Sequence, residues 1–588
     1  MERNAMRLSG YLSIPAIFLF CFNLLSCKGA PNIDTDKCSA CKNISFQDMT
    51  FGKSITITDA EYVPSGLNVL KPYCRVKARI WPEIDFEIEL PAHSNWNGKL
   101  LYNGGGGWDG FIPDLSVGRK RDYASAGSNG GHTSSLVWLA DIPYVGGLLG
   151  QVACFDGSAF DMSDPAHANV PQKLDDFGHR AAYEGSVLAK RIITAYYDED
   201  PKKSYWMGCS NGGRGAMMMA QRHPEVFDGY IAGAPHFTYT GTTMRGLWDS
   251  QASAGCLNGA CDDSRAFIPL SVYNTDAVTY LGYVMPKLLL LNERVYEKCD
   301  CGGAYDSVAG DGIIDQPDKC AFDPTVDLLP DACPGDVDSP DCFTSGQQEA
   351  LRKIYKGMEA QGMAFSGMDA GLFPGTPVGA EGLIMLGWMG SIVPMPPDTL
   401  DIPDGIGDML CAPFFQFIQY NLAWQEGTDW DWKAFNFQTD PQNITNHGIM
   451  NVLDATSGDL AAVKARGAKI IHYHGWADAL VTPLYSKAYY DNVLVPKMGN
   501  VDSFYRLFFV PGYSHCQGGV GCGDIDWLTT LENWVEKGIA PDKIIGTRAV
   551  DYLMGFYTKR TRPICPYPKV ARYSGSGSTD DAENFYCE

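Results

Sequence analysis

The stretch 204–212, Ser-Tyr-Trp-Met-Gly-Cys-Ser-Asn-Gly, decides the fold. Its first four residues fit a short strand, and the next five match the pattern G-x-S-x-G with Ser210 at the centre. This pattern is typical of a sharp strand-to-helix turn that lifts a serine hydroxyl clear of a sheet. In a chain with 64 glycines the pattern alone is weak, and a glycine-rich turn is the alternative. The surroundings of the turn therefore carry the argument.

These surroundings alternate between strand and helix, as in a parallel α/β sheet. A helix with a methionine-rich face is expected over 215–222, and an apolar strand over 229–232. The other expected elements are strands within 54–80 and over 86–90, 99–102, 469–473 and 504–510, and helices over 175–197 and 483–493.

The alternation breaks between these two groups of elements. From about 235 to 444 the chain is rich in Cys, Asp, Gly and Pro, with short helical stretches at 284–296 and 347–358. We therefore predict one α/β domain, formed by 28–236 and 446–588 after a leader over 1–27, and interrupted by a Cys-rich lid domain over 237–445. Insertions above the carboxyl edge of such a sheet commonly close a site and select substrates.

A serine nucleophile needs a base and a group that orients the base. In α/β-hydrolases these residues follow in the order Ser, acid, His, each on a loop after a strand. Asp478 and His515 satisfy both order and location, since each lies just after an expected strand. A helix-capping carboxylate and a surface histidine are the alternatives, but the joint arrangement favours a Ser210–Asp478–His515 triad.

A glycine run, Asn-Gly-Gly-Gly-Gly-Trp-Asp-Gly over 103–110, follows the early strand at 99–102. Such a loop supplies one N–H group of an oxyanion hole, and the residue after the nucleophile supplies the other. We assign these two donors to Gly106 and Asn211. The run also satisfies G-x-G-x-x-G, but no helix clearly opens there, so a dinucleotide site is not expected.

The N-terminus is typical of an export signal. Arg3 and Arg7 precede an apolar stretch, 11–25, that is shorter than a membrane span. The run over 24–27 resembles a bacterial lipobox ending at Cys27, so membrane attachment through a lipid on Cys27 and ordinary cleavage nearby both stay open. We expect a secreted, periplasmic or outer-surface protein. The net charge of −23, without a basic run, argues against a nucleic-acid partner.

Export places the remaining 17 cysteines where disulfides persist, and their odd number leaves at least one thiol over. Cys209 directly precedes Ser210 and Cys516 directly follows His515, so a Cys209–Cys516 bridge would join the nucleophile loop to the base loop. Zinc binding at Cys38/Cys41 or Cys299/Cys301 is the less favoured reading, because no second ligand pair matches. The pairing stays open for Cys38, Cys41, Cys74, Cys154, Cys256, Cys261, Cys301, Cys411 and Cys522.

The combination Cys-Ser, Asp and His-Cys, with the glycine run and the insertion, resembles the tannase and feruloyl esterase family of α/β-hydrolases, which includes hydrolases of terephthalate monoesters. The resemblance covers 38–587. It implies a carboxylic ester hydrolase acting through an acyl-enzyme on small aromatic or phenolic esters, some attached to plant polysaccharide or tannin. It also implies the bridges Cys299–Cys320, Cys333–Cys342 and Cys565–Cys587.

The resemblance further implies a structural Ca²⁺ in the lid. By position in the family motif, Asp300, Asp306 and Asp311 would supply carboxylates, and Val308 and Ile313 backbone carbonyls. Oxygen ligands suit calcium. The loop has extra residues relative to the family pattern and does not match an EF-hand, so a solvated acidic loop is the alternative.

Substrate specificity is expected to reside in the lid. His474 is assigned to the wall of the substrate pocket by its motif position, and Trp388 with Phe414, Phe415 and Phe417 could line an aromatic pocket, although such residues are more often core. Two rival functions remain, an exported α/β-hydrolase peptidase and a calcium-dependent surface binding protein without turnover.

Overall fold

The computed structural model describes residues 33–47, 49, 52–66, 71–107, 109–133, 170–257, 259–359, 372–382, 387–389, 391–393, 432–441, 448–548 and 559–588. The predicted export signal and Cys27 lie outside these residues, as do Phe414, Phe415 and Phe417. No helix in the described part is long and apolar enough to cross a membrane.

The expected strands, together with β5, which was not expected from the sequence, pair into one nine-stranded sheet in the order β1-β2-β3-β5-β4-β6-β7-β12-β13. The first four strands in this order pair antiparallel, and the pairs from β5 to β13 are all parallel. The strands are β1 (Ile55–Val63), β2 (Tyr73–Ile80), β3 (Ile84–Pro91), β4 (Lys99–Asn103), β5 (Ala124–Ser128), β6 (Lys203–Cys209), β7 (Gly229–Gly233), β12 (Lys469–Gly475) and β13 (Tyr505–Val510).

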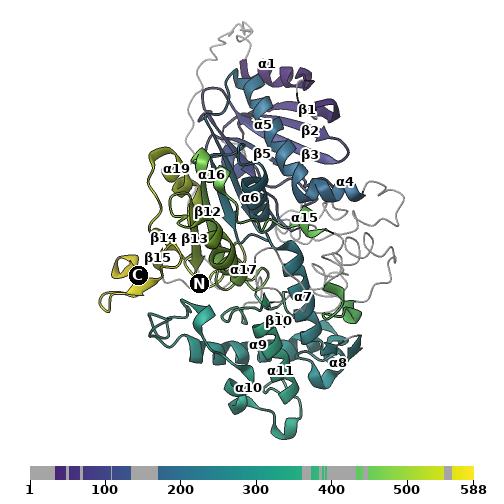
Figure 1. The fold of residues 1–588 in the computed structure, drawn as a ribbon, viewed down its shortest axis with the longest axis vertical. Helices are drawn as coiled ribbons and strands as arrows, with labels where there is room; N and C mark the ends of the chain where they lie inside the picture. Colours follow the sequence, from purple (N-terminus) through teal and green to yellow (C-terminus); the bar gives the residue numbers. More distant parts are fainter. Residues whose placement is uncertain are drawn as a thin grey trace, which may run out of the picture.

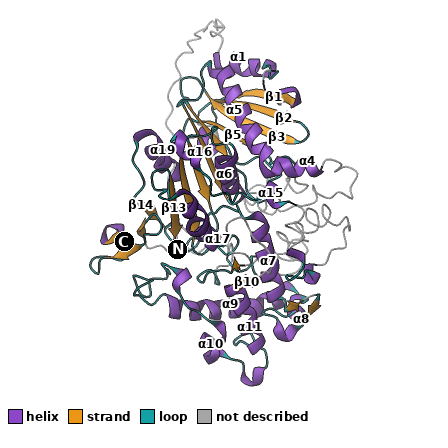
Figure 2. Cartoon of the chain, viewed as in Figure 1, coloured by secondary structure: helices purple, strands orange, loops and turns teal. Residues whose placement is uncertain are grey.

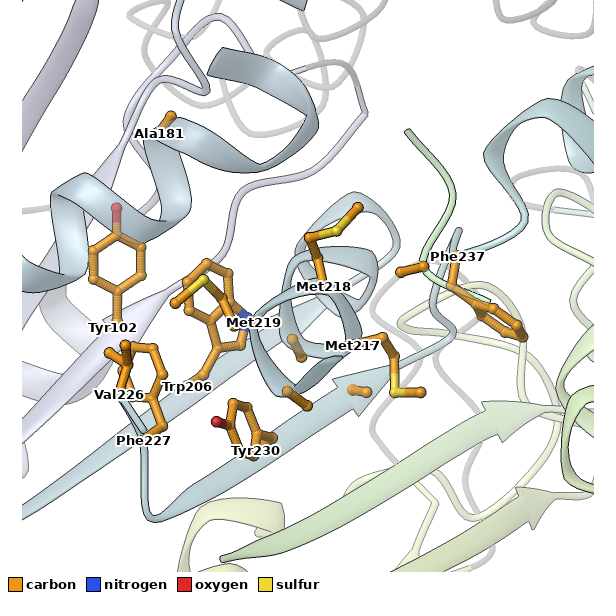
Figure 3. Close-up of a cluster of buried hydrophobic side chains, with 14 of the residues drawn as sticks. Tyr102, Ala181, Trp206, Met217, Met218, Met219, Val226, Phe227, Tyr230 and Phe237 are labelled. Atoms are coloured by element: carbon orange, nitrogen blue, oxygen red, sulfur yellow. The ribbon is translucent and has the colours of Figure 1, made fainter. Parts of the chain in front are cut away.

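Helices cover both faces of the parallel part, which is why its strands are apolar along their length. Successive residues of β6 show the two faces. Trp206 joins the buried cluster that contains Met217 and Met219 of α6 (Asn211–Arg222), as Figure 3 shows. Its neighbour Tyr205 packs in a second cluster with Leu531 of α19 (Trp527–Lys537). A strand alternates its side chains, so this one strand contributes to the core on both sides.

The segment between β7 and β12 has a hydrophobic core of its own. Its main helices are α7 (Tyr239–Ser253), α9 (Ala277–Cys299) and α11 (Ser345–Lys356), and Figure 1 shows them beyond one end of the sheet. Figure 2 shows that the segment is mainly helix and loop. The helix expected at 284–296 is the C-terminal part of α9, which begins earlier because the Asp276 side chain accepts the N–H groups of Val278 and Thr279.

Six disulfides cross-link the described chain. All four bridges expected above are present, including Cys209–Cys516. Cys38–Cys74 and Cys256–Cys261 complete the set. Since Cys38 and Cys299 are bonded to other cysteines, neither zinc reading holds. Cys41, Cys301 and Cys522 are free thiols, and Cys154 and Cys411 lie outside the described residues.

Candidate active site

Ser210 occupies a strained turn between β6 and α6. Its backbone has φ 60° and ψ −121°, outside the favoured φ/ψ regions of residues with a Cβ, as is typical of the nucleophile in a G-x-S-x-G turn. The turn is fixed through its backbone, since Ser210 N–H donates to the Gly233 carbonyl and the Ser210 carbonyl accepts from His236 N–H. The serine side chain is therefore displayed by main-chain bonds.

Four glycines meet behind the nucleophile. A Cβ on Gly212 would lie 2.5 Å from the Gly105 carbonyl oxygen, and one on Gly208 would lie 2.5 Å from the Gly212 backbone. Gly104 likewise approaches Gly212, at 2.7 Å from an added Cβ to its Cα. The glycine run thus packs directly on the start of α6, which places Gly106 next to the turn that carries Asn211.

Asp478 and His515 form the acid–base half of the site. Asp478 lies on the loop after β12 and His515 on the loop after β13, and Asp478 Oδ2 is 2.6 Å from His515 Nδ1. Asp478 is fully buried, and its Oδ1 accepts the N–H groups of Leu480 and Val481 at 3.0 and 2.8 Å. Burial alone would raise the pKa of Asp478, but the nearby His515 and the hydrogen bonds from His474 and His515 outweigh it, so that the pKa lies well below its usual value.

The base loop and the nucleophile loop are joined covalently. Cys209 and Cys516, the chain neighbours of Ser210 and His515, form a disulfide with a Cα–Cα distance of 6.0 Å. Within the described residues no direct hydrogen bond links the Ser210 hydroxyl to His515, whose Nδ1 binds Asp478. Such bonds are often long without substrate, and binding through Nδ1 leaves Nε2 of His515 for the serine.

The oxyanion side of the site contains a buried polar network that the sequence did not reveal. Asn211 Nδ2 donates to Asp109 Oδ1 at 3.0 Å, and Asn211 Oδ1 accepts from Arg214 Nε at 2.6 Å. Burial raises the pKa of Asp109 to about 7, partly offset by Asn211 and Arg214. A cavity of about 30 Å³ lies beside these residues, which is room for about one water molecule.

His236 is a second residue that sequence reasoning missed. It follows β7, and its backbone binds Ser210. The ring is stacked on Tyr239 with centroids 4.3 Å apart, and its buried Nε2 has no hydrogen-bond partner among the described residues. Burial lowers the pKa of His236 to about 3, with smaller contributions from Arg214 and His515. The rule that found Asp478 and His515, a polar residue just after a parallel strand, would also have found His236.

The carboxylates expected to bind calcium in the acidic loop of the lid make hydrogen bonds within the protein. Asp300 accepts the N–H groups of Gly310 and Gly312, and Asp311 Oδ2 lies 2.6 Å from an Arg562 guanidinium nitrogen. Among the described residues, no group of three or more His, Cys, Asp or Glu side chains could hold a metal ion. Carboxylate and carbonyl oxygens are the ligands that calcium prefers. Calcium in this loop, with Asp306 and the Val308 and Ile313 carbonyls, stays a prediction.

Comparison with known proteins decides the family. The model of the family described as tannase and feruloyl esterase matches residues 67–588. The chain belongs to the tannase and feruloyl esterase family. An uncharacterized esterase of Xanthomonas campestris pv. campestris is 30% identical over 91% of this chain and 89% of its own. Mono(2-hydroxyethyl) terephthalate hydrolase of Piscinibacter sakaiensis is 30% identical over 92% of this chain and 90% of its own.

Solved structures agree on the fold. Feruloyl esterase B from Aspergillus oryzae superimposes with a TM-score of 0.70 at 23% identity, over 94% of this chain and all of that one. This likeness and the sheet order establish an α/β-hydrolase fold. Membership of the tannase and feruloyl esterase family makes the chain a carboxylic ester hydrolase.

The pocket roles assigned to Trp388 and His474 stay predictions, and both side chains are fully buried. Trp388 is fully buried in the core of the lid, with Tyr355 and Phe267 as aromatic neighbours at 5.1 and 6.4 Å. His474 is also fully buried and binds Asp478 Oδ2 at 3.1 Å. Neither side chain presents a surface to a substrate in this structure. Motif position alone cannot tell a pocket wall from the layer behind it.

Proposed function

We propose that this esterase is exported and cleaves esters of aromatic carboxylic acids through an acyl-enzyme. The observation that carries the proposal is the linked geometry of the triad, in which the Asp478–His515 hydrogen bond is tied to Ser210 by the Cys209–Cys516 bridge. Six disulfides support export, because such bonds persist in oxidising compartments. The localisation and the lipid on Cys27 remain part of the proposal.

In this mechanism Ser210 Oγ attacks the ester carbonyl carbon while His515 Nε2 accepts the hydroxyl proton. The negative charge that forms on the carbonyl oxygen is stabilised by the N–H groups of Gly106 and Asn211. His515 then gives the proton to the departing alkoxide as the C–O bond breaks. A water molecule, deprotonated by the same histidine, hydrolyses the acyl-enzyme and restores the Ser210 hydroxyl. Asp478 keeps the imidazole in one tautomer throughout.

The role of Ser210 is tested by substitution and labelling. Ser210→Ala should remove hydrolysis while thermal stability is kept, because the change removes the nucleophile and little packing. Comparable serine enzymes lose about six decades of turnover in this way. A fluorophosphonate probe should label the wild type and not the variant. Residual activity of more than a few per cent would exclude Ser210, and absence of labelling would favour the binding-protein alternative.

The substrate class rests on the relatives, whose names specify feruloyl and terephthalate esters. A panel of methyl gallate, methyl ferulate, a terephthalate monoester and aliphatic esters separates the candidates, and peptide amides test the peptidase alternative. Aromatic acyl groups should give the highest kcat/KM. Equal or better values for butyrate and longer aliphatic esters would overturn the substrate class without affecting the triad. Ferulate release from plant polysaccharide or gallate release from tannin would show the natural form of the ester.

The predicted calcium has a separate test. If the lid loop over 299–320 binds it, elemental analysis should find calcium in purified protein, and a chelator should lower the melting temperature, because a ligand of the native state stabilises that state. Arg562→Leu, which removes the closer of the two arginines paired with Asp311, should then leave calcium content unchanged or raise it. If purified protein contains no calcium and a chelator leaves the melting temperature unchanged, the loop is a solvated acidic loop without a calcium site.

A further inference from the structure

A chain of buried hydrogen bonds leads from the interior of the sheet to Asp478. Tyr505 Oη lies 2.5 Å from His472 Nδ1, and His472 Nε2 lies 2.8 Å from Ser486 Oγ. The same hydroxyl lies 2.7 Å from His474 Nδ1, whose Nε2 contacts Asp478 Oδ2 at 3.1 Å. All five residues are fully buried.

Local structure explains why these side chains meet. His472 and His474 are two residues apart on β12, so both point to the same face of the sheet. Ser486 lies on α17 (Pro483–Ala488), which begins a few residues after the acid loop and packs over that face. Tyr505 opens the neighbouring strand β13. The pattern His-x-His before the acid loop therefore places two imidazoles in line with the catalytic carboxylate.

The acceptors at the end of the chain fix the position of every proton. His474 Nε2 contacts only oxygen acceptors, Asp478 Oδ2 and the Val481 carbonyl at 2.8 Å, so this nitrogen carries a proton. With one proton on each imidazole, His474 Nδ1 must accept from the Ser486 hydroxyl. Ser486 Oγ must then accept from His472 Nε2–H, and the Tyr505 hydroxyl donates to His472 Nδ1.

We propose that this chain is a positioning relay, in which Ser486 holds the His474 ring in the orientation that lets Nε2–H donate to Asp478 and thereby keeps His515 oriented toward Ser210. The proposal rests on the proposed catalytic role of the triad. It makes His474 a positioning residue, since its side chain is enclosed and reaches the reacting atoms only through Asp478. His472 and Tyr505 hold the serine hydroxyl in its place.

The physical effect lies in how Asp478 is shared. Its carboxylate accepts four N–H groups, two from the backbone at Oδ1 and two from imidazoles at Oδ2. Four donors match the lone pairs of a carboxylate and lock its plane. Without Ser486, His474 Nδ1 loses the hydroxyl donor that holds the imidazole, and the ring can turn so that Nε2–H donates to the Val481 carbonyl instead of Asp478 Oδ2. The negative charge of Asp478 would then concentrate on its hydrogen bond with His515.

The test compares two buried serine deletions. Ser486→Ala should lower kcat about tenfold, the change expected for one net hydrogen bond, with KM unchanged. The acid limb of the kcat pH profile should move to higher pH, because Asp478 then holds the proton on the His515 imidazole more strongly. Ser186→Ala is the matched control, since Ser186 is equally buried and donates to the Ala182 carbonyl within α5 (Ala181–Tyr197). It should change neither quantity.

A second pair of variants separates positioning from packing. His474→Gln places an amide N–H where Nε2 lies and needs no tautomer, so it should retain kcat within about threefold. His474→Leu fills similar space without a donor and should lose at least tenfold. The downfield proton resonance of the His515–Asp478 bond should survive in His474→Gln and weaken in His474→Leu, which is a readout that does not depend on turnover.

The outcomes separate the relay from the function on which it rests. Wild-type kcat and pH profile in Ser486→Ala, with Ser210→Ala inactive, would overturn the relay alone. Equal losses in Ser486→Ala and Ser186→Ala, or in the two His474 variants, would also overturn it. Hydrolysis that persists in Ser210→Ala would instead overturn the proposed function.

Discussion

The two halves of the candidate triad are held in place by different means. On the nucleophile side, Ser210 is set by backbone bonds and by glycines that let three segments touch. On the acid side, Asp478 is set by hydrogen bonds from two imidazoles and two backbone N–H groups. The nucleophile side should be sensitive to any side chain added at these glycines. The acid side should be sensitive to the loss of any hydrogen-bond donor to Asp478. The two halves should therefore fail under different substitutions.

Among substitutions that leave the Ser210 hydroxyl in place, the largest effect is expected at the carboxylate of Asp478. Asp478→Asn keeps the shape but replaces one acceptor oxygen by an NH₂ group, which turns His515 toward the wrong tautomer. Other triads lose about 10⁴ in kcat through this change. Kinetics on a family substrate, together with a thermal melt, measure the effect. Asp459→Asn is the control, because Asp459 is an exposed carboxylate that accepts the backbone N–H of Ala461. A loss below tenfold at Asp478 would refute its role.

The volume-sensitive side is tested by a single methyl group. Gly212→Ala should lower kcat by about 100-fold, the scale expected when reacting groups move by about 1 Å, because the new Cβ would displace the Gly105 carbonyl beside the oxyanion donors. Gly282→Ala is the control, since Gly282 lies within α9 and an added Cβ there meets nothing within 4 Å. That control should instead stabilise the protein slightly. An active Gly212→Ala enzyme would show that close packing is dispensable.

Between the two halves lies the bridge. Replacing Cys209 and Cys516 together by alanine should reduce kcat about tenfold, because the loops of Ser210 and His515 are then free to separate. The loss of kcat should be seen at temperatures where the variant is still fully folded. The matched control removes Cys565–Cys587, which closes a loop in the C-terminal tail. Equal activity losses in the two double variants would assign the bridge to stability only.

The smallest effect concerns Asp109, the buried carboxyl group on the nucleophile side. The folded-state pKa of Asp109 is about 7, above the value of about 3.9 of an unperturbed aspartate. The neutral carboxyl therefore stabilises the fold fully below about pH 4, and this contribution is lost as the pH rises through 7. Asp109→Asn should flatten the melting temperature between pH 5 and 8, whereas Asp114→Asn at an exposed helix start should not. Parallel curves for wild type and Asp109→Asn would contradict the assignment.

This contrast also explains what could be predicted from the sequence. The G-x-S-x-G turn, the glycine run and the strand-helix order are local, because glycine spacing reports directly on backbone approach. Asp478 and His515 could be found because each follows a strand. The partners of Asp478 could not, since Ser486 and Tyr505 reach it through His472 and His474 only after β12, α17 and β13 have packed.

The same limit applies to His474 and to the lid. The motif indicates that His474 is close to the site. Only the fold shows whether a histidine four residues before Asp478 faces the substrate or the interior. In the lid, helix ends were underestimated where a capping residue such as Asp276 extends α9. The buried site of Trp388 reflects the lid's own core, which no pattern in an irregular, Cys-rich segment reveals.

The acid loop belongs physically to the lid as much as to the sheet. Ala477 and Ala479, on either side of Asp478, pack in the hydrophobic core of the lid, and Arg245 of α7 donates to the Ala479 and Leu480 carbonyls at 2.9 and 3.0 Å. A chimera that exchanges the lid between relatives at its chain boundaries would cut through this contact and move the acid. Transferring residues 475–482 together with the lid would keep the catalytic carboxylate in contact with the lid residues that position it in the parent protein.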